Sequence, residues 1–312
     1  MKAQDTVNVH TKEVRLTIDN DVFTSLERDQ YYTSGLYLDY RWLSKNKINK
    51  HKINKHKINK HKINKHKIIH SISLHQRIYT PRRVSWDDPK EFDRPYAGLL
   101  GLSLNREFYI NQKEYLKISV ELGLMGPHTL TDDFQITWHK VLNIPIPAGW
   151  KYQIAHSPVI NFHASYARRL VGNEIIDLYS QSNISVGTVF NQFSEELLVR
   201  FNFLKHQAST TLFGGHLGSV SSSNRTKKII ESYFFYAPGF IYCAYNATIE
   251  GNFIGPQSPH TEIAKPWLIQ NRLGFALSWH QFDLITTYYI KTKETLEAEA
   301  HQYVGITLNN RF

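Results

Sequence analysis

Apolar and polar residues alternate with a period of two along most of this chain. In residues 113–125, five aliphatic side chains share one face: Leu116, Ile118, Val120, Leu122 and Leu124. Polar or small residues occupy the opposite face: Lys117, Ser119, Glu121 and Gly123. Such alternation predicts a β-strand with one apolar face and one polar face.

The same pattern appears near both ends of the chain. In residues 31–42 the apolar face is expected to carry Tyr32, Leu36, Leu38, Tyr40 and Trp42. The opposite face is expected to carry Thr33, Gly35, Asp39 and Arg41. The final segment alternates as far as Phe312, which lies on the apolar face.

Three features favour a membrane barrel over a soluble β-sandwich. The alternating segments often reach about 11 to 15 residues, whereas strands of soluble proteins usually have five or six. Aromatic residues gather near the segment ends, as in the interfacial girdles of outer-membrane barrels. The terminal Phe312 resembles the C-terminal signal that the barrel-assembly machinery reads. We therefore predict an all-β fold, a transmembrane antiparallel β-barrel in the outer membrane of a Gram-negative bacterium.

The alternation predicts about twelve strands in a single domain, residues 1–312. Their approximate ranges are 12–22, 31–44, 69–80, 97–109, 114–126, 158–170, 175–187, 190–204, 230–248, 266–280, 281–292 and 301–312. An even number of strands puts both termini on the periplasmic side. No apolar run reaches the roughly 18 residues of a transmembrane helix. Inward polar residues such as Arg41, Lys117 and Glu121 should fill the narrow lumen, which argues against an open pore.

The positive charge of the chain is concentrated in one repeat. The formal net charge is +10, and residues 45–68 contain ten lysines and no acid. Because a nucleic-acid-binding protein needs a basic face spread over its fold, we expect no nucleic-acid partner. The repeat falls in a periplasmic turn between the second and third strands. A solvated turn is the simplest interpretation, and binding of a metal, an anionic lipid or a cell-wall polymer is the alternative.

One helix is predicted within an extracellular loop, residues 127–157. Residues 131–142 place Phe134, Trp138, Val141 and Leu142 at helical spacing. Thr131 can cap the start of the helix, and acidic residues follow it, as the helix dipole favours. Such a helix would lie near the outer leaflet.

Three polar clusters lie at the extracellular ends of the early strands. Residues 19–21 read Asp-Asn-Asp, residues 31–35 read Tyr-Tyr-Thr-Ser-Gly, and His139 lies on the loop helix. The first two clusters belong to neighbouring antiparallel strands and should be close in space. Oxygen-rich side chains suit a hard cation such as calcium, and a nearby histidine can act as a general base on water. Turn formation by 19–21 and a structural His139 are the alternatives.

The order of the motifs resembles that of the LpxR family of outer-membrane lipid A 3′-O-deacylases. The resemblance spans most of the chain outside the repeat. It rests on these segments: Asn20-Asp21-Val22-Phe23, Tyr32-Thr33-Ser34-Gly35-Leu36, Tyr79-Thr80-Pro81, Arg94-Pro95-Tyr96-Ala97-Gly98, Gly123-Leu124-Met125-Gly126-Pro127, His139, Gly149-Trp150-Lys151-Tyr152-Gln153, Ile249-Glu250-Gly251-Asn252-Phe253 and Lys293-Glu294. No single motif is specific, and the ordered set carries the resemblance.

The resemblance implies a calcium-dependent hydrolase that cleaves the 3′ acyloxyacyl ester of lipid A, or lipopolysaccharide, in the outer leaflet. Asn20 and Asp21 would shape the Ca²⁺ site, and Thr33 would support it by hydrogen bonding. His139 would be the general base. A basic residue after the Tyr-Thr-Pro motif, Arg82 or Arg83, would stabilise the oxyanion. We expect a monomer that meets the barrel-assembly machinery only during biogenesis.

The chain departs from the family in one respect. Characterised members have an active-site glutamate a few residues after the histidine, but residues 140–145 hold no acid. Asp19, Asp132 and Asp133 are the candidates to replace it. Two alternative functions follow: a related lipid esterase or phospholipase, and a barrel of the same fold without enzymatic activity.

Overall fold

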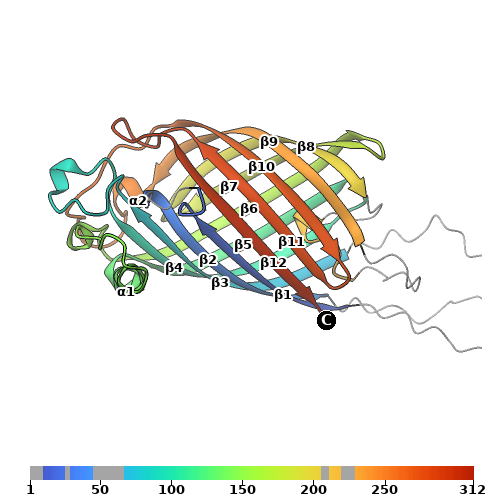
Figure 1. Ribbon diagram of the computed structural model, residues 1–312, viewed down its shortest axis with the longest axis horizontal. Coiled ribbons are helices and arrows are strands. Elements are labelled where there is room, and N and C mark those ends of the chain that lie inside the picture. Colours follow the sequence, from blue (N-terminus) through green and yellow to red (C-terminus); the bar gives the residue numbers. More distant parts are fainter. Residues whose placement is uncertain (1–9, 25–28, 45–66, 205–210, 219–228) are drawn as a thin grey trace, which may run out of the picture.

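The computed structural model describes residues 10–24, 29–44, 67–204, 211–218 and 229–312, and these residues form a closed antiparallel β-barrel (Figure 1). Its twelve strands are β1 (Lys12–Asn20), β2 (Tyr31–Leu43), β3 (Lys67–Thr80), β4 (Ala97–Tyr109), β5 (Glu114–Met125), β6 (Ser157–Gly172), β7 (Ile176–Gly187), β8 (Phe190–Leu204), β9 (Ile229–Asn246), β10 (Trp267–Trp279), β11 (Phe282–Lys291) and β12 (His301–Arg311). Each strand pairs with its neighbours in sequence, and β1 closes the barrel on β12. The predicted fold and strand number are confirmed.

The strand ends fall within a few residues of those predicted. Residues 67–68 were expected in the turn that holds the Lys/His repeat, but they begin β3. The rest of the repeat, 45–66, lies outside the described residues.

The end of β12 lies at the same end of the barrel as the start of β1, and we call this the terminal end (Figure 1). Among the described helices, none is long and apolar enough to cross a membrane.

The wall of the barrel separates apolar from polar side chains, as the alternation predicts. Leu38, Leu74 and Phe162 are about half exposed on the outside, where lipid would cover them. Arg41 is buried in the lumen, where its guanidinium pairs with the carboxylates of Glu13 and Glu107. Because a buried charge is tolerated only when it is paired, such ion pairs let one continuous sheet enclose a charged interior.

Tyr32 departs from the predicted pattern. It was expected on the apolar outer face, but it is buried inside and donates a hydrogen bond to Asp19 (2.8 Å). The cause is a β-bulge in β2: Tyr32 pairs with Tyr79 of β3 and Ser34 pairs with Ile78, so Thr33 has no partner in the register. An extra residue in one strand reverses the direction of the side chains on one side of it.

A chain segment narrows the lumen at the terminal end. The short 3₁₀ helix η4 (Thr211–Phe213) places the ring of Phe213 against that of Tyr115, with centroids 5.1 Å apart. Tyr109 donates a hydrogen bond to the carbonyl of Phe213 (2.5 Å), and Arg41 donates one to the carbonyl of Gly214 (3.3 Å). These contacts fill the lumen more completely than the strand side chains alone.

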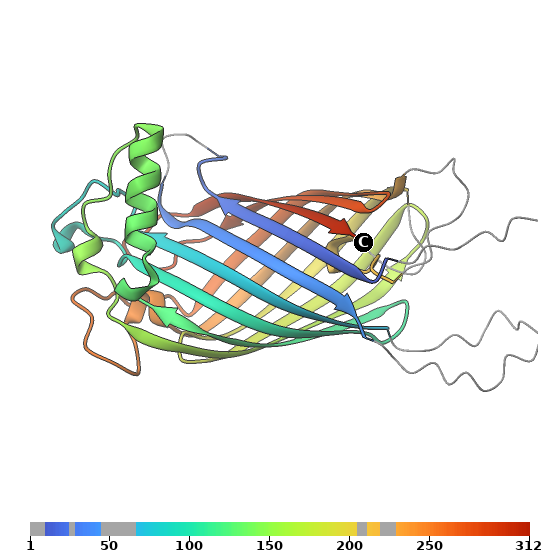
Figure 2. The same ribbon diagram turned by 90° about the horizontal axis from the view of Figure 1, so that it is seen from below.

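Helix α1 (Thr131–Leu142) lies at the opposite end, across the early strands and outside the barrel wall (Figures 1 and 2). Thr131 was expected to cap it, but the cap position is Leu130, in the left-handed conformation. The hydroxyl of Thr131 instead bonds with Gln76 of β3 (3.1 Å) and Thr129 (2.8 Å). These bonds attach the start of the helix to the barrel wall.

Candidate functional site

A pocket of about 370 Å³ lies between α1 and the outer surface of β1, β2 and β3. We call it the wall pocket. Its apolar lining comes from Ile18, Leu36, Ile78, Phe134, Trp138, Leu142 and Ile144, together with Val22 and Phe23. Its polar lining comes from Asn20, Asp21, Asp29, Thr33, Ser34, Gln76, Gln135 and His139. Polar groups at the base of an apolar pocket are typical of a small-molecule or lipid site.

The irregular ends of β1 and β2 bring the polar groups into this pocket. β1 ends at Asn20, whose side chain accepts a hydrogen bond from the backbone N–H of Val22 (2.8 Å). Asp21 follows the strand and is buried. The bulge in β2 turns both Thr33 and Ser34 towards the wall pocket. Three of the residues predicted to form the site, Asn20, Asp21 and Thr33, therefore do lie together.

Two carboxylates share a single hydroxyl in this pocket. The hydroxyl oxygen of Thr33 lies 3.1 Å from Asp21 Oδ1 and is also in contact with Asp29 Oδ1. A threonine hydroxyl has one proton, so it can donate to only one of them at a time. Burial and the negative charge of Asp29 raise the pKa of Asp21 well above its ordinary value, although hydrogen bonds from Gln30 and Thr33 oppose this. The pair therefore carries an excess of negative charge.

His139 lies between two hydrogen-bond acceptors. Its Nδ1 is 2.5 Å from the carbonyl oxygen of Pro145, and its Nε2 is 2.7 Å from Asp29 Oδ2. A carbonyl can only accept, so Nδ1 carries a proton, and an ionised Asp29 requires a proton on Nε2 as well. Burial lowers the pKa of His139, but the hydrogen bonds to Asp29 and Pro145 and the charge of Asp29 outweigh it and raise the pKa above its ordinary value.

A second chain of contacts positions Asp29 and α1. Gln135 lies one turn before His139 on α1 and donates to both carboxylate oxygens of Asp29, at 3.2 and 3.3 Å. The indole N–H of Trp150 donates to the side-chain oxygen of Gln135 (2.9 Å) and so fixes which way the amide points. Trp150 belongs to the Gly-Trp motif seen in the sequence, and its place here is structural support for the site.

Other predicted residues lie elsewhere. Arg82 and Arg83 do not line the wall pocket: both stack on Trp86, and Arg82 pairs with Glu299 (2.7 Å). The exposed fraction of the Arg82 side chain is 37%, so this pair contributes little to stability.

The acid that accompanies His139 was not among those expected. Asp19 points into the lumen, and Asp132 and Asp133 are in the first turn of α1, two turns from His139. Asp29 instead contacts the imidazole. It lies in the same β1–β2 loop as Asp21, three residues before the Tyr32-Thr33 motif. Its position beside the cluster of Asp21 and Thr33 is the sequence signal for this role, although Asp29 is 110 residues from His139 in the chain.

The oxygen atoms near Thr33 fit a hard cation better than a transition metal. The carboxylates of Asp21 and Asp29 and the amide of Asn20 are oxygen donors of the kind that calcium takes. Within the described ranges, no group of three or more His, Cys, Asp or Glu side chains is arranged to hold a metal ion. Carbonyls, hydroxyls and water would have to complete the coordination of a cation there.

Comparisons with known proteins agree with this architecture. A solved structure of LpxR from Salmonella typhimurium is similar, with a TM-score of 0.72 and 14% sequence identity, over 96% of this chain and 100% of that one. The β-domain of the Bordetella autotransporter BrkA matches less closely, with a TM-score of 0.51, 9% identity and coverage of 98% and 100%. Comparison with curated protein sequences gives no match. At these identities, the structural likeness shows the fold.

The family is shown by the sequence itself. The profile of the family described as "Outer membrane protein LpxR" matches residues 1–312, the whole chain. Together with the twelve-stranded barrel, this places the protein in the outer membrane of a Gram-negative bacterium, as predicted. The chain belongs to the LpxR family.

Proposed function

We propose that this protein is a lipid A 3′-O-deacylase that hydrolyses the 3′ acyloxyacyl ester at the wall pocket. The observation that carries the proposal is the contact of His139 with Asp29, beside Asp21 and Thr33, in an apolar pocket on the outside of a membrane barrel. A lipid in the outer leaflet could reach such a pocket without leaving the membrane. Phe134, Trp138 and Leu142 would contact its acyl chains.

His139 has the geometry of a general base once its Nε2 proton is lost. The Pro145 carbonyl keeps the remaining proton on Nδ1, so the lone pair of Nε2 faces the side of the pocket that holds Asp29 and Asp21. There it can take a proton from water as the water oxygen attacks the ester carbonyl. The same proton can then pass to the alkoxide that leaves when the ester C–O bond breaks. The Pro145 carbonyl orients the neutral ring through Nδ1, Asp29 stabilises the imidazolium once Nε2 has taken the proton, and Gln135 orients Asp29.

Asp21 and Asp29, with Asn20, are the proposed holders of Ca²⁺. When bound, the cation would polarise the ester carbonyl and offset the excess negative charge near Thr33. The shared hydroxyl supports this assignment, because it places two carboxylates side by side, and after burial the negative charge of Asp29 is the next cause of the raised pKa of Asp21.

The test is mass spectrometry of lipid A from cells that express the protein. We expect loss of the 3′ acyloxyacyl group, and we expect His139→Ala to abolish that loss while the barrel still folds. General base catalysis is worth roughly 10²- to 10⁴-fold. Thr137→Ala is the matched control, because Thr137 is exposed on the same helix and does not line the pocket.

The same experiment separates the alternatives. Unchanged lipid A together with release of fatty acid from phospholipid vesicles would indicate a phospholipase of the same mechanism. Unchanged lipid A without any ester hydrolysis, from folded protein with calcium present, would indicate a barrel without activity.

A further inference from the structure

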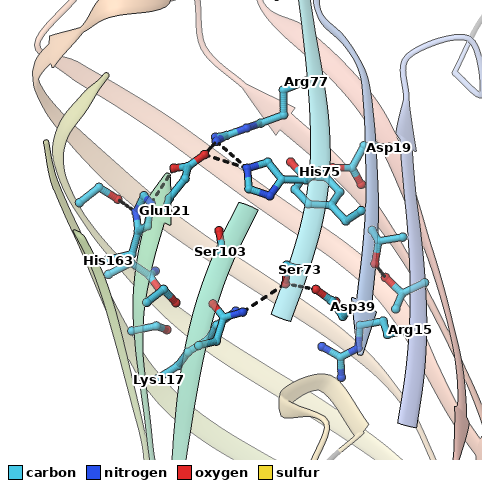
Figure 3. A pocket seen from close by; sticks show the side chains of 18 of the residues that line it. Arg15, Asp19, Asp39, Ser73, His75, Arg77, Ser103, Lys117, Glu121 and His163 are labelled. Atoms are coloured by element: carbon cyan, nitrogen blue, oxygen red, sulfur yellow. Dashed lines mark hydrogen bonds and ion pairs between the residues drawn. The ribbon is translucent and has the colours of Figure 1, made fainter. Parts of the chain in front are cut away.

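The lumen contains a polar chamber of about 520 Å³ that the proposed function does not use (Figure 3). No residue lines both this chamber and the wall pocket, because the barrel wall separates the two cavities. The chamber is lined largely by polar side chains, among them Lys117, Glu121, His163 and Ser185. Pockets of about 300 to 1,000 Å³ are large enough for small organic ligands.

A serine, a histidine and a carboxylate are joined in a line on the wall of this chamber. Ser185 Oγ is 2.8 Å from His163 Nδ1, and His163 Nε2 is 2.9 Å from Glu121 Oε2. The three residues come from the adjacent strands β7, β6 and β5, and Ser185 is the register partner of His163. Their relative positions are therefore set by the sheet and not by a loop.

The carboxylate decides which nitrogen of His163 is the base. Glu121 also accepts hydrogen bonds from Arg77 and Asn161, and Figure 3 shows it between Arg77, His75 and His163. An ionised carboxylate can only accept, so the neutral imidazole of His163 must carry its proton on Nε2. The lone pair of Nδ1 then faces the hydroxyl of Ser185.

Two further features distinguish this line from a simple polar filling of the lumen. The His163 side chain is 28% exposed, whereas that of Glu121 is 1% exposed, so the base faces the chamber and the acid is shielded behind it. Lys117 lines the same chamber and adds a positive charge on β5. A nucleophile and a base oriented by an acid are the components that nucleophilic acyl transfer requires.

We propose that the chamber is a second hydrolytic site that acts on small carboxylic esters, with Ser185 as the nucleophile. Its oxygen attacks the ester carbonyl carbon while His163 Nδ1 takes the hydroxyl proton. The ester C–O bond then breaks, and His163 returns the proton to the leaving alkoxide, which departs as an alcohol. Water repeats the sequence on the acyl-serine and releases a carboxylic acid. Glu121 is a positioning residue, and lipid A is too large for the chamber.

Labelling with diisopropyl fluorophosphate tests this site without any lipid substrate. The serine oxygen would attack phosphorus, the P–F bond would break with loss of fluoride, and His163 would take the serine proton. We expect the folded, detergent-solubilised protein to gain one diisopropylphosphoryl group, located on Ser185 by peptide mapping. Ser185→Ala should remove the adduct. His163→Asn should slow labelling by about 100-fold or more.

Ser165→Ala is the matched control. Ser165 lines the same chamber on β6, but no described histidine forms a hydrogen bond with it. The labelling of this variant should match that of the unaltered protein. Faster migration of unheated than of boiled samples on gels would confirm that each variant is folded. Absence of an adduct on folded protein would overturn the proposal. So would an adduct mapped to another residue, or equal labelling rates with and without His163. Peptide mapping of the unaltered protein decides the matter even where a variant fails to fold.

Discussion

At the scale of single residues, the contact between His139 and Asp29 determines how the candidate site ionises. Both nitrogens of the imidazole face acceptors, so the protonated ring is favoured. A general base must be neutral, and a raised pKa means that the neutral form appears only at a higher pH. The stabilising contact is fully present below the ordinary pKa of histidine, about 6.5, and is lost as the pH rises through the raised value.

This predicts a titration that can be followed without activity. In calcium-free protein, NMR of histidine-labelled samples should show His139 titrating above about 6.5. Asp29→Asn should move that titration to lower pH, because the negative charge is removed. His139→Gln identifies the signal by its absence. An unchanged titration in Asp29→Asn would contradict the role given to Asp29.

The sequence predicts best the contacts between residues on strands that follow one another in the chain. Asn20, Asp21 and Thr33 could be placed together because adjacent strands bring them together. Asp29 was missed because its contact with His139 joins a hairpin loop to a helix more than 100 residues away. The direction of Tyr32 was also missed, since the bulge at Thr33 leaves no mark in the alternation of apolar residues.

At the scale of the element, α1 presents two different faces to the wall pocket. Gln135 and His139 are buried and carry the polar contacts, whereas Phe134 and Trp138 are about half exposed along an adjacent stripe. Residues four apart lie above one another on a helix, so each pair forms a continuous strip. The helical spacing predicted this amphipathic character, but the sequence alone could not show that the apolar strip faces a pocket.

Trp138→Ala should therefore weaken substrate binding more than chemistry. Loss of the contact with an acyl chain would cost about 1–2 kcal/mol, which raises KM by roughly 5- to 30-fold with little change in kcat. Val141→Ala is the control, because Val141 is 71% exposed on the same helix and does not line the pocket. Equal KM values for the two variants, measured with lipid A in mixed micelles, would contradict this role for the apolar strip.

At the scale of the whole molecule, a charged interior is enclosed by an apolar outer surface. The alternation of residues predicts this division directly, and it predicted that Arg41 would face inward. It could not predict which acids would pair with Arg41, or that η4 would enter the lumen. Both depend on strands and loops that are distant in sequence.

Removing Arg41 should destabilise the barrel. Arg41→Ala would remove the guanidinium that pairs with buried Glu107 and would leave Glu13 with Arg15 alone, at a cost of about 3–5 kcal/mol. Lys117→Ala is the comparison, since Lys117 lines the lumen and acts on Glu107 only through its charge, with no hydrogen bond or ion pair between these two described side chains. Urea unfolding, read from the fraction of unheated protein that migrates as a folded band, should show a clearly lower midpoint for Arg41→Ala. Equal midpoints would show that the buried pairs do not hold the barrel together.

The central claim is hydrolysis of lipid A at the wall pocket, and mass spectrometry of purified lipid A incubated with the purified protein tests it most directly. With calcium present, we predict a mass loss equal to the 3′ acyloxyacyl group. Removal of calcium by a chelator should stop the reaction, and added calcium should restore it. Lipid A of unchanged mass after incubation with folded protein and calcium would contradict the account.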